Sequence, residues 1–258
     1  MIDTHTHLCD PIFDEDRSGV LERARKAGVS AVITVSEDLD DATRNLELAE
    51  KYPMLWPAAG LYPTHLNFAD AAAMLSLIRR ERRRLIAIGE VGLDYWVVKS
   101  DSERKIQKEI FTGFIDLAEE LGLPLNVHSR SAGRHAVKML IGRGATRVQL
   151  HAFDGKAASA LPAVDAGYFF SVPPSIIRSP QKQKLIRRLP LSSLLIETDS
   201  PVLGPSPGER NEPANAPVSV RAIAELKGVS QEEVLEVTRQ NVGRLYGDRI
   251  AREGQKKG

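Results

Sequence analysis

The sequence predicts a single-domain α/β protein of the TIM-barrel class, a (β/α)8 barrel. Eight short apolar runs recur along the 258 residues, and most are almost continuously apolar, as in parallel strands that are covered on both faces. Amphipathic segments with a helical period separate these runs, and no long linker divides the chain. We therefore expect one barrel domain over residues 1–250 and a flexible tail over residues 251–258.

The predicted elements alternate regularly along the chain. The strands cover residues 1–8, 30–36, 55–63, 85–94, 123–129, 147–153, 168–174 and 194–201. The helices between them cover residues 16–28, 41–52, 70–83, 102–122, 133–144, 156–167 and 179–189. Gly28, Gly122 and Gly167 stand where helices end, as glycine commonly does. A loop rich in Pro, Gly and Asn over residues 202–216 precedes two closing helices in 217–247.

Composition excludes several classes of protein. The 35 Lys and Arg residues nearly balance 34 Asp and Glu residues, so the chain is neither a basic nucleic-acid-coating protein nor an acidic disordered one. No apolar run approaches the roughly 20 residues of a membrane helix, and the N-terminus does not read as a signal peptide. We therefore expect a cytoplasmic protein without membrane contact. Cys9 is the only cysteine, which excludes an internal disulfide and a thiolate metal site.

Two histidines near the N-terminus are the first candidates for metal ligands. His5 and His7 are separated by one residue in the first predicted strand, and the two-residue period of a strand sends both side chains to the same face. A lone buried histidine is usually a core residue. A pair on one face, with Asp3 close by, is more typical of a metal site.

Four further polar residues lie at the ends of apolar runs: Glu90, His128, His151 and Asp199. The carboxyl ends of all strands open onto one mouth of a (β/α)8 barrel, so residues far apart in the sequence meet there. Six polar groups at the ends of apolar strands would be unfavourable unless something satisfied them. We therefore expect these four and the two N-terminal histidines to form one site.

The chemistry of this set favours divalent ions. Histidine and carboxylate ligands without thiolates suit Zn²⁺, Mn²⁺ or Mg²⁺, and six ligands exceed the four of one tetrahedral zinc. We expect His5, His7 and Asp199 to hold one ion and His128 and His151 the other, with Glu90 bridging them. Glu90 and Asp199 are then the catalytic carboxylates, and a water that bridges the metals is the expected nucleophile.

Two divalent ions leave the cluster positive, which suits an anionic phosphodiester. Basic residues in the loops and helices that follow the strands agree with such a substrate: Lys99, Arg130, Arg134, Lys156, Arg178, Lys182, Lys184 and Arg210. Arg130, two residues after His128, is the expected phosphate contact because its guanidinium cannot bind a metal. The denser run Arg79, Arg80, Arg82, Arg83 and Arg84 ends a helix before a strand, so we expect it on the opposite face, as a solvated helix end.

Three other residues are placed by the same reasoning. Glu197 precedes Asp199 by two residues and points to the same side one layer deeper, so we expect it to orient a ligand histidine through the second ring nitrogen. His65, in the loop after the third strand, could face the mouth. His135 is expected at the surface.

The motifs around these residues resemble those of the TatD-type metal-dependent hydrolases, usually described as deoxyribonucleases, in the amidohydrolase superfamily. They are DTHTHL at 3–8, GEVGLDY at 89–95, VHSRSA at 127–132, HAFDG at 151–155, ETDSP at 197–201 and RNEPAN at 210–215. The resemblance extends in order from residue 1 to about residue 247. It implies a distorted TIM barrel, a site for one or two metals with the same six ligands, and nuclease activity that is often exonucleolytic in the 3′ to 5′ direction.

Two departures from the family pattern affect the substrate more than the metal. The family commonly has Gly-x-His-Pro-His after the third strand, whereas this chain has Tyr62 in the histidine's place and His65 one position later. The family's HCFSG reads HAFDG, with Ala152 and Asp154. Tyr62 and His65 therefore join Arg130 as expected substrate contacts.

Three functions follow from this reading. The first is hydrolysis of DNA, single-stranded or at its ends. The second is hydrolysis of an ester or amide, as by an aminoacyl-tRNA deacylase or a small-molecule amidohydrolase; Glu90 stands where many amidohydrolases have a carboxylated lysine, which weakens this alternative. The third is a non-catalytic metal-binding protein, disfavoured because no ligand position is lost. No feature points to an obligatory protein partner.

Overall fold

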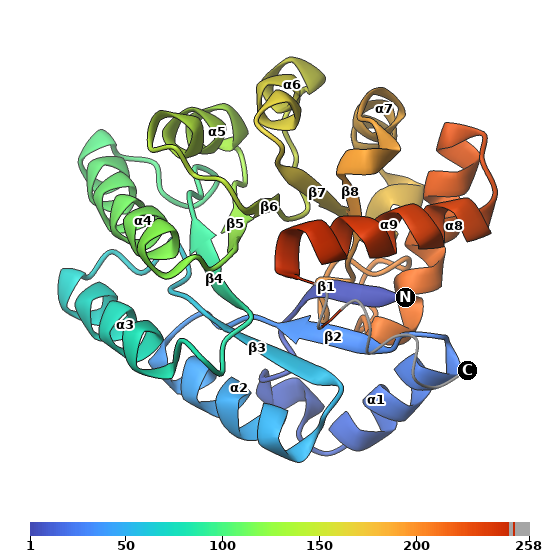
Figure 1. Cartoon of the computed structure of the whole chain (residues 1–258), viewed down its shortest axis with the longest axis horizontal. Coiled ribbons are helices and arrows are strands. Elements are labelled where there is room, and N and C mark those ends of the chain that lie inside the picture. The colour runs from blue at the N-terminus through green and yellow to red at the C-terminus, as the bar shows by residue number, and fades with distance from the viewer. Residues whose placement is uncertain (248–249, 251–258) are drawn as a thin grey trace.

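The protein folds as a (β/α)8 barrel, as the sequence predicts. The computed structural model describes residues 1–247 and residue 250, so the tail predicted over residues 251–258 lies outside the described residues. Eight parallel strands pair in sequence order, and helices surround them (Figure 1). The strands are β1 (Ile2–Thr6), β2 (Ala31–Thr34), β3 (Leu55–Ala59), β4 (Ala87–Gly92), β5 (Leu125–His128), β6 (Val148–Leu150), β7 (Phe169–Val172) and β8 (Leu194–Ile196).

Every strand ends earlier than its apolar run suggested, and all except β3 and β8 also begin later. The difference is largest for β8, which ends at Ile196 and not at residue 201. Asp199 has a φ of 55°, in the left-handed region, so the backbone has already left the strand there. Two backbone hydrogen bonds join this segment to β1: His7 N donates to Ser200 O at 2.8 Å, and Asp199 N donates to His5 O at 2.9 Å.

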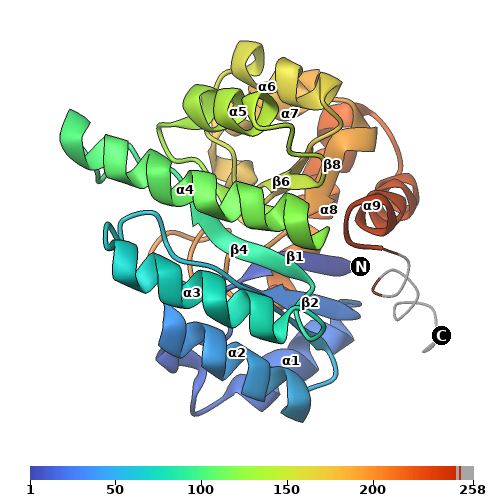
Figure 2. The ribbon, with the colours of Figure 1, turned by 60° about the vertical axis from the view of Figure 1, so that its left-hand side comes forward.

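Nine α-helices occur among the described residues: α1 (Arg17–Lys26), α2 (Leu39–Lys51), α3 (Phe68–Glu81), α4 (Asp101–Leu121), α5 (Gly133–Gly142), α6 (Ala157–Asp165), α7 (Pro180–Arg188), α8 (Ala216–Lys227) and α9 (Gln231–Tyr246). Figure 2 shows α2, α3 and α4 side by side on the outside of the barrel. Gly122 follows α4 with a φ of 65°, so the glycine predicted to end this helix does so.

The last helix closes the end of the barrel where the strands begin. Val242, Leu245 and Tyr246 of α9 pack in one hydrophobic cluster with residues near the strand starts, among them Ile2 and Ala31. Figure 1 shows α9 lying across this end, next to the N-terminus. The opposite end, where the strands finish, is therefore the one left open for a site.

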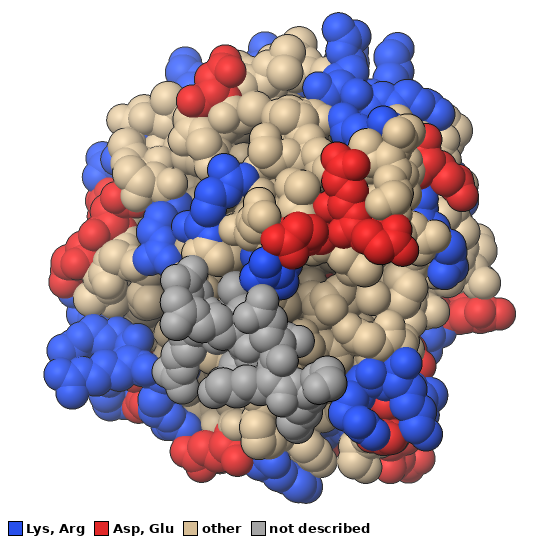
Figure 3. Space-filling view, turned by 45° about the vertical axis from the view of Figure 1, so that its right-hand side comes forward, with Lys and Arg blue, Asp and Glu red and all other residues tan. Residues whose placement is uncertain are grey.

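Charged side chains of both signs are mixed on the face of the molecule that Figure 3 shows. Figure 3 shows Lys and Arg interspersed with Asp and Glu on one face of the molecule, in keeping with the net charge of +1. Within the described residues, no helix combines the length and apolar character needed to cross a membrane.

Candidate metal centre

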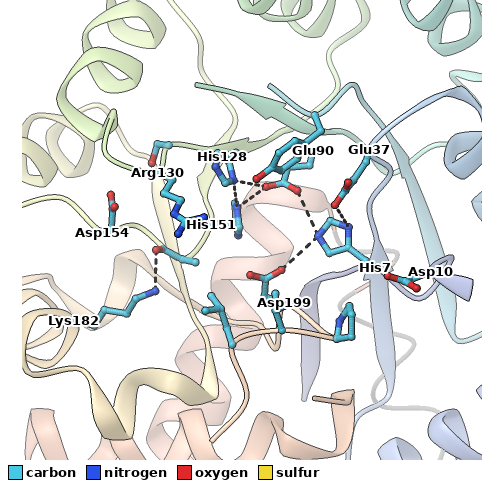
Figure 4. Close-up of a pocket in the computed structure, with 16 residues that line it drawn as sticks. His7, Asp10, Glu37, Glu90, His128, Arg130, His151, Asp154, Lys182 and Asp199 are labelled. Atoms are coloured by element: carbon cyan, nitrogen blue, oxygen red, sulfur yellow. Dashed lines mark hydrogen bonds and ion pairs between the residues drawn. The ribbon is translucent and has the colours of Figure 1, made fainter. Parts of the chain in front are cut away.

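All six predicted ligands meet at the carboxyl ends of the strands. His5 lies in β1 with His7 directly after it, Glu90 in β4 and His128 at the end of β5. His151 follows β6, and Asp199 lies three residues beyond β8. Five of them line a pocket of about 540 Å³ (Figure 4), whereas His5 is fully buried and does not line it.

Glu90 lies in the middle of the cluster and faces two pairs of histidines. Its Oε1 is 2.7 Å from His128 Nδ1 and 2.7 Å from His151 Nε2. Its Oε2 is 3.4 Å from His7 Nε2 and 3.9 Å from His5 Nε2. One carboxylate therefore presents a different oxygen to each half of the site.

Asp199 completes the half that contains the N-terminal histidines. Its Oδ1 is 3.5 Å from His5 Nε2 and 3.4 Å from His7 Nε2, and the two Nε2 atoms are 3.3 Å apart. The His5 and His151 rings stack at 3.9 Å, so the two halves are in contact. Three overlapping groups of buried ligand atoms result, each fitting within 4.8 Å: His5, His151 and Asp199; His5, His7 and Glu90; and Glu90, His128 and His151.

The backbone around Glu90 is crowded, which explains two glycines. A Cβ at Gly92 would lie 2.1 Å from the carbonyl oxygen of His128, and one at Gly60 would lie 2.5 Å from the carbonyl oxygen of Glu90. Both approaches are closer than any side chain tolerates. These glycines allow β4 to bring its carboxylate up against the histidine at the end of β5.

Two polar residues that the sequence analysis did not select support the histidines. The Oδ1 of Asn126 lies 2.8 Å from His5 Nδ1, which leaves Nε2 to face the site. The Oδ2 of Asp94 lies 3.0 Å from His128 Nε2, which leaves Nδ1 to face Glu90. Such outer partners fix the tautomer and the orientation of a ligand ring. Asn126 could have been found from the two-residue period of β5, which places it one layer below His128.

Glu197 is buried beneath the site, but it contacts the chain differently from the prediction. Its Oε1 accepts a hydrogen bond from Ala152 N at 2.8 Å and its Oε2 one from Ser171 Oγ at 2.6 Å, whereas His151 Nδ1 is 3.8 Å away. Ala152 has a φ of 41°, an uncommon value for a residue with a side chain. Glu197 therefore holds the strained turn after His151 and does not hydrogen-bond to the ring itself.

Burial and mutual charge control protonation of the cluster. Burial opposes ionisation of Glu90, but the positive charges of His151 and His128 outweigh it and hold the pKa of the carboxyl well below its usual range. Burial also disfavours the charged form of His5, yet Asp199 and Glu90 raise its pKa to about 10. Burial and the charge of His5 lower the pKa of His151 to about 4. The carboxylates thus attract positive charge into the site, as cation ligands do.

Both basic residues that line the pocket lie at one end of it, whereas acidic residues occur at both ends (Figure 4). Arg130 and Lys182 lie on the side of His128 and His151, together with Asp154, whose Oδ2 accepts a hydrogen bond from Ser131 N at 2.9 Å. Glu37 and Asp10 lie on the side of His7. Tyr62 also lines the pocket, and its ring contacts that of His128 at 5.0 Å.

Other predicted mouth residues lie outside the pocket lining. His65 is half-buried, and His135 is half-buried against Tyr95 and not simply at the surface. Six of the eight basic residues proposed for the mouth also do not line the pocket: Lys99, Arg134, Lys156, Arg178, Lys184 and Arg210. Arg210 binds Asp16 at 2.7 Å and the carbonyl of Ile12, because the loop after β8 folds over the start of α1.

The donor set fits divalent ions. The ligand atoms that converge are ring nitrogens and carboxylate oxygens, which are the donor atoms that such ions take from proteins. A family model described as TatD related DNase matches residues 2–247. The chain belongs to the TatD-related DNase family.

Relatives of known name agree with this family. Deoxyribonuclease TATDN3 of Homo sapiens is 45% identical over 258 residues, covering 95% of this chain and 94% of the human protein. The metal-dependent hydrolase TatD of Mycobacterium tuberculosis is 38% identical, covering 96% of this chain and 98% of the relative. The crystal structure of the TatD homologue YjjV from Escherichia coli superposes with a TM-score of 0.88 at 30% identity, covering 95% and 97% of the two chains. The protein is thus a metal-dependent hydrolase of the TatD family.

Proposed function

We propose that this TatD-family protein is a two-metal phosphodiesterase that cleaves DNA, acting on single strands or strand ends. The position of Glu90 carries the proposal: a single carboxylate directs one oxygen to His128 and His151 and the other to His7 and His5. The names of relatives such as human deoxyribonuclease TATDN3 support DNA as the substrate.

In this proposal His5, His7 and Asp199 would hold one ion and His128 and His151 the other, and Glu90 would be shared between them. When bound, two divalent ions lower the pKa of a water molecule and stabilise negative charge on phosphate oxygens. Four imidazoles among six ligands favour Zn²⁺ or Mn²⁺ over Mg²⁺. Asp94 and Asn126 keep the rings oriented through the hydrogen bonds described above.

The remaining steps belong to side chains of the pocket. Arg130 binds a phosphate oxygen of the substrate and orients the scissile group. Lys182, whose Nζ donates to the carbonyl of Ala152 at 3.0 Å, adds a second positive charge at the same end. Asp199 accepts the proton of the attacking water on Oδ2, since its Oδ1 faces the histidines. As the water oxygen bonds to phosphorus, the opposite P–O bond breaks, and the released alkoxide takes up the proton that Asp199 accepted. Tyr62 and His65 are proposed to contact the substrate beyond these groups.

An ester hydrolase acting on an aminoacyl group is the second candidate. The acidic residues Asp10, Glu37 and Asp154 line the pocket and would suit the ammonium group of such a substrate. In this case the same six ligands would hold the same ions, and the group that is hydrolysed would be a carbonyl ester in place of a phosphodiester.

A panel of substrates decides between the two candidates. Protein loaded with Zn²⁺, Mn²⁺ or Mg²⁺ is assayed on single-stranded DNA, duplex DNA, RNA, an aminoacyl ester and a simple amide. We expect the highest kcat/KM on single-stranded DNA. Turnover of the ester or amide with no release of nucleotides would refute the proposal, and the variant Glu90→Gln serves as the control for contaminating nucleases.

A further inference from the structure

Trp96 is a large apolar side chain that remains exposed at the mouth of the barrel. It lies six residues after Glu90, in the turn between β4 and α4, and 57% of its surface is accessible. No role in metal binding involves it. Single exposed apolar residues are common on protein surfaces, and what distinguishes Trp96 is the set of groups that contact it.

The turn that carries Trp96 is held firmly to the metal ligands. Asp94 Oδ1 accepts a hydrogen bond from Val97 N at 2.8 Å, while Oδ2 of the same carboxylate meets His128 at 3.0 Å. Tyr95 N donates to the carbonyl of Arg130 at 2.9 Å. The position of the indole is therefore tied to that of His128.

Two cations lie against the indole ring. The Cζ of Arg130 is 5.1 Å from the ring centroid, and the Nζ of Lys99 is 5.2 Å from it. Arg130 also lines the pocket, so the aromatic surface and the pocket are joined by a guanidinium. Lys99 does not line the pocket, but it adds a second positive charge next to the indole ring.

Exposed aromatic rings next to cations are the elements with which proteins bind single-stranded nucleic acid. Each base stacks on a ring while the charges neutralise the adjacent phosphates, and this requires no particular sequence. The faces of a base within a duplex are covered by its neighbours, so the ring is available only to an unpaired base.

We propose that Trp96 is a stacking platform for an unpaired nucleobase next to the scissile phosphate, with Arg130 and Lys99 binding the phosphates on either side of that base. The inference rests on the proposed nuclease function and gives that site its preference for single strands. It does not depend on the strand polarity or on the identity of the metal.

Tryptophan fluorescence tests the contact without relying on turnover. The chain has only two tryptophans, and Trp56 is half-buried in β3. Oligothymidylate added to the metal-free protein should quench the emission, and the variant Trp96→Phe, which retains only Trp56, should show no quenching. Absence of quenching in the wild-type protein at saturating strand, or equal quenching in Trp96→Phe, would overturn the proposal.

Kinetics then measure what the contact contributes. Stacking is worth about 1–3 kcal/mol per base, so Trp96→Ala should raise KM for oligothymidylate roughly 5- to 150-fold, while Trp96→Phe should retain most of the affinity. On a strand of the same length with abasic sites, wild type and Trp96→Ala should have equal KM values. Ile141→Ala is the matched control, because it truncates an exposed apolar side chain on the outer helix α5.

The outcomes separate this inference from the proposed function. Cleavage of DNA with KM unchanged in Trp96→Ala refutes the platform and leaves the nuclease intact. Quenching at Trp96 by a strand that the loaded enzyme never cleaves supports the platform and refutes the nuclease. A dimer of the wild-type protein that dissociates in Trp96→Ala would assign the indole to self-association and overturn the proposal.

Discussion

The carboxylate of Glu90 contacts both halves of the site. Each oxygen faces a different pair of histidines, with 2.7 Å to one pair and 3.4 to 3.9 Å to the other. Its negative charge is what would hold two cations close together. The charge of this residue, more than its volume, should therefore determine activity.

Glu90→Gln preserves the volume and removes the charge. We expect activity to fall by more than about 100-fold, since even outer partners of metal ligands are worth roughly 10- to 100-fold. The fold should persist, as judged by circular dichroism, because the residue lies at the mouth and not among the hydrophobic side chains of the barrel. Near-normal turnover with full metal content would show that Glu90 is not shared.

Arg130 offers a second test at the level of one residue. Arg130→Ala should lower kcat/KM on DNA by about 10- to 100-fold, the value of a charge-assisted hydrogen bond, while metal content stays at the wild-type level. Arg134→Ala is the control, because Arg134 is exposed on the adjacent helix and does not line the pocket. A lower melting temperature with normal cleavage would mean that Arg130 has a structural role.

At the scale of elements, the topology of the barrel places the arginines at the end of α3 far from the candidate metal centre. Two of the arginines there bind acidic residues of neighbouring elements: Arg79 binds Glu120 of α4, and Arg84 binds Glu50 of α2 at 2.6 Å. The segment ends where β4 begins, which is the end of the barrel opposite the pocket. The densest basic run of the sequence is therefore kept away from the chemistry.

Salt dependence of DNA binding distinguishes the two ends of the barrel. A mouth that neutralises about two to four phosphates of a single strand should give a slope of log K against log salt of about −1.5 to −3. Replacing Arg82, Arg83 and Arg84 with Ala should leave the slope unchanged, whereas Lys182→Ala should flatten it by about 0.7. Loss of binding in the triple variant would place DNA on the other face.

For the whole molecule, the site joins segments that are far apart in the sequence. Its six residues span positions 5 to 199, and β1 is held to the segment after β8 by hydrogen bonds next to His5 and Asp199. Bound ions would therefore link the first strand of the barrel to the segment that follows the last strand. Since the six residues, which span positions 5 to 199, meet only in the folded chain, such binding should favour the folded state.

Metal removal tests this connection. At 100 times Kd an ion adds about 2.7 kcal/mol per site, so chelation should lower the melting temperature by about 5–10 °C for each site emptied. Elemental analysis of the reconstituted protein should approach two equivalents. The variant His128→Ala should bind one equivalent fewer, whereas His135→Ala, which changes a residue outside the site, should bind both. If the wild-type protein binds one equivalent and His128→Ala binds the same amount, the protein has no second ion.

The sequence by itself determined the barrel and the meeting of the six candidate ligands. Both depend on periodicity: apolar runs of strand length alternate with amphipathic helices, and a parallel barrel brings all carboxyl strand ends to one mouth whatever their distance in the sequence. His5 and Asp199 could therefore be placed together without knowing any loop. For the same reason, the run of arginines from Arg79 to Arg84 could be placed at the end of the barrel opposite the mouth.

Only the tertiary structure decided which groups surround the ligands. Asp94 reaches His128 from the segment after β4, Glu197 holds the strained backbone of Ala152, and Arg210 binds Asp16, which is 194 residues away in the sequence. These contacts depend on the path of the loops and on side-chain rotamers, which have no period in the sequence. The same holds for Trp96, whose exposure beside Arg130 results from the hydrogen bonds that fix its turn.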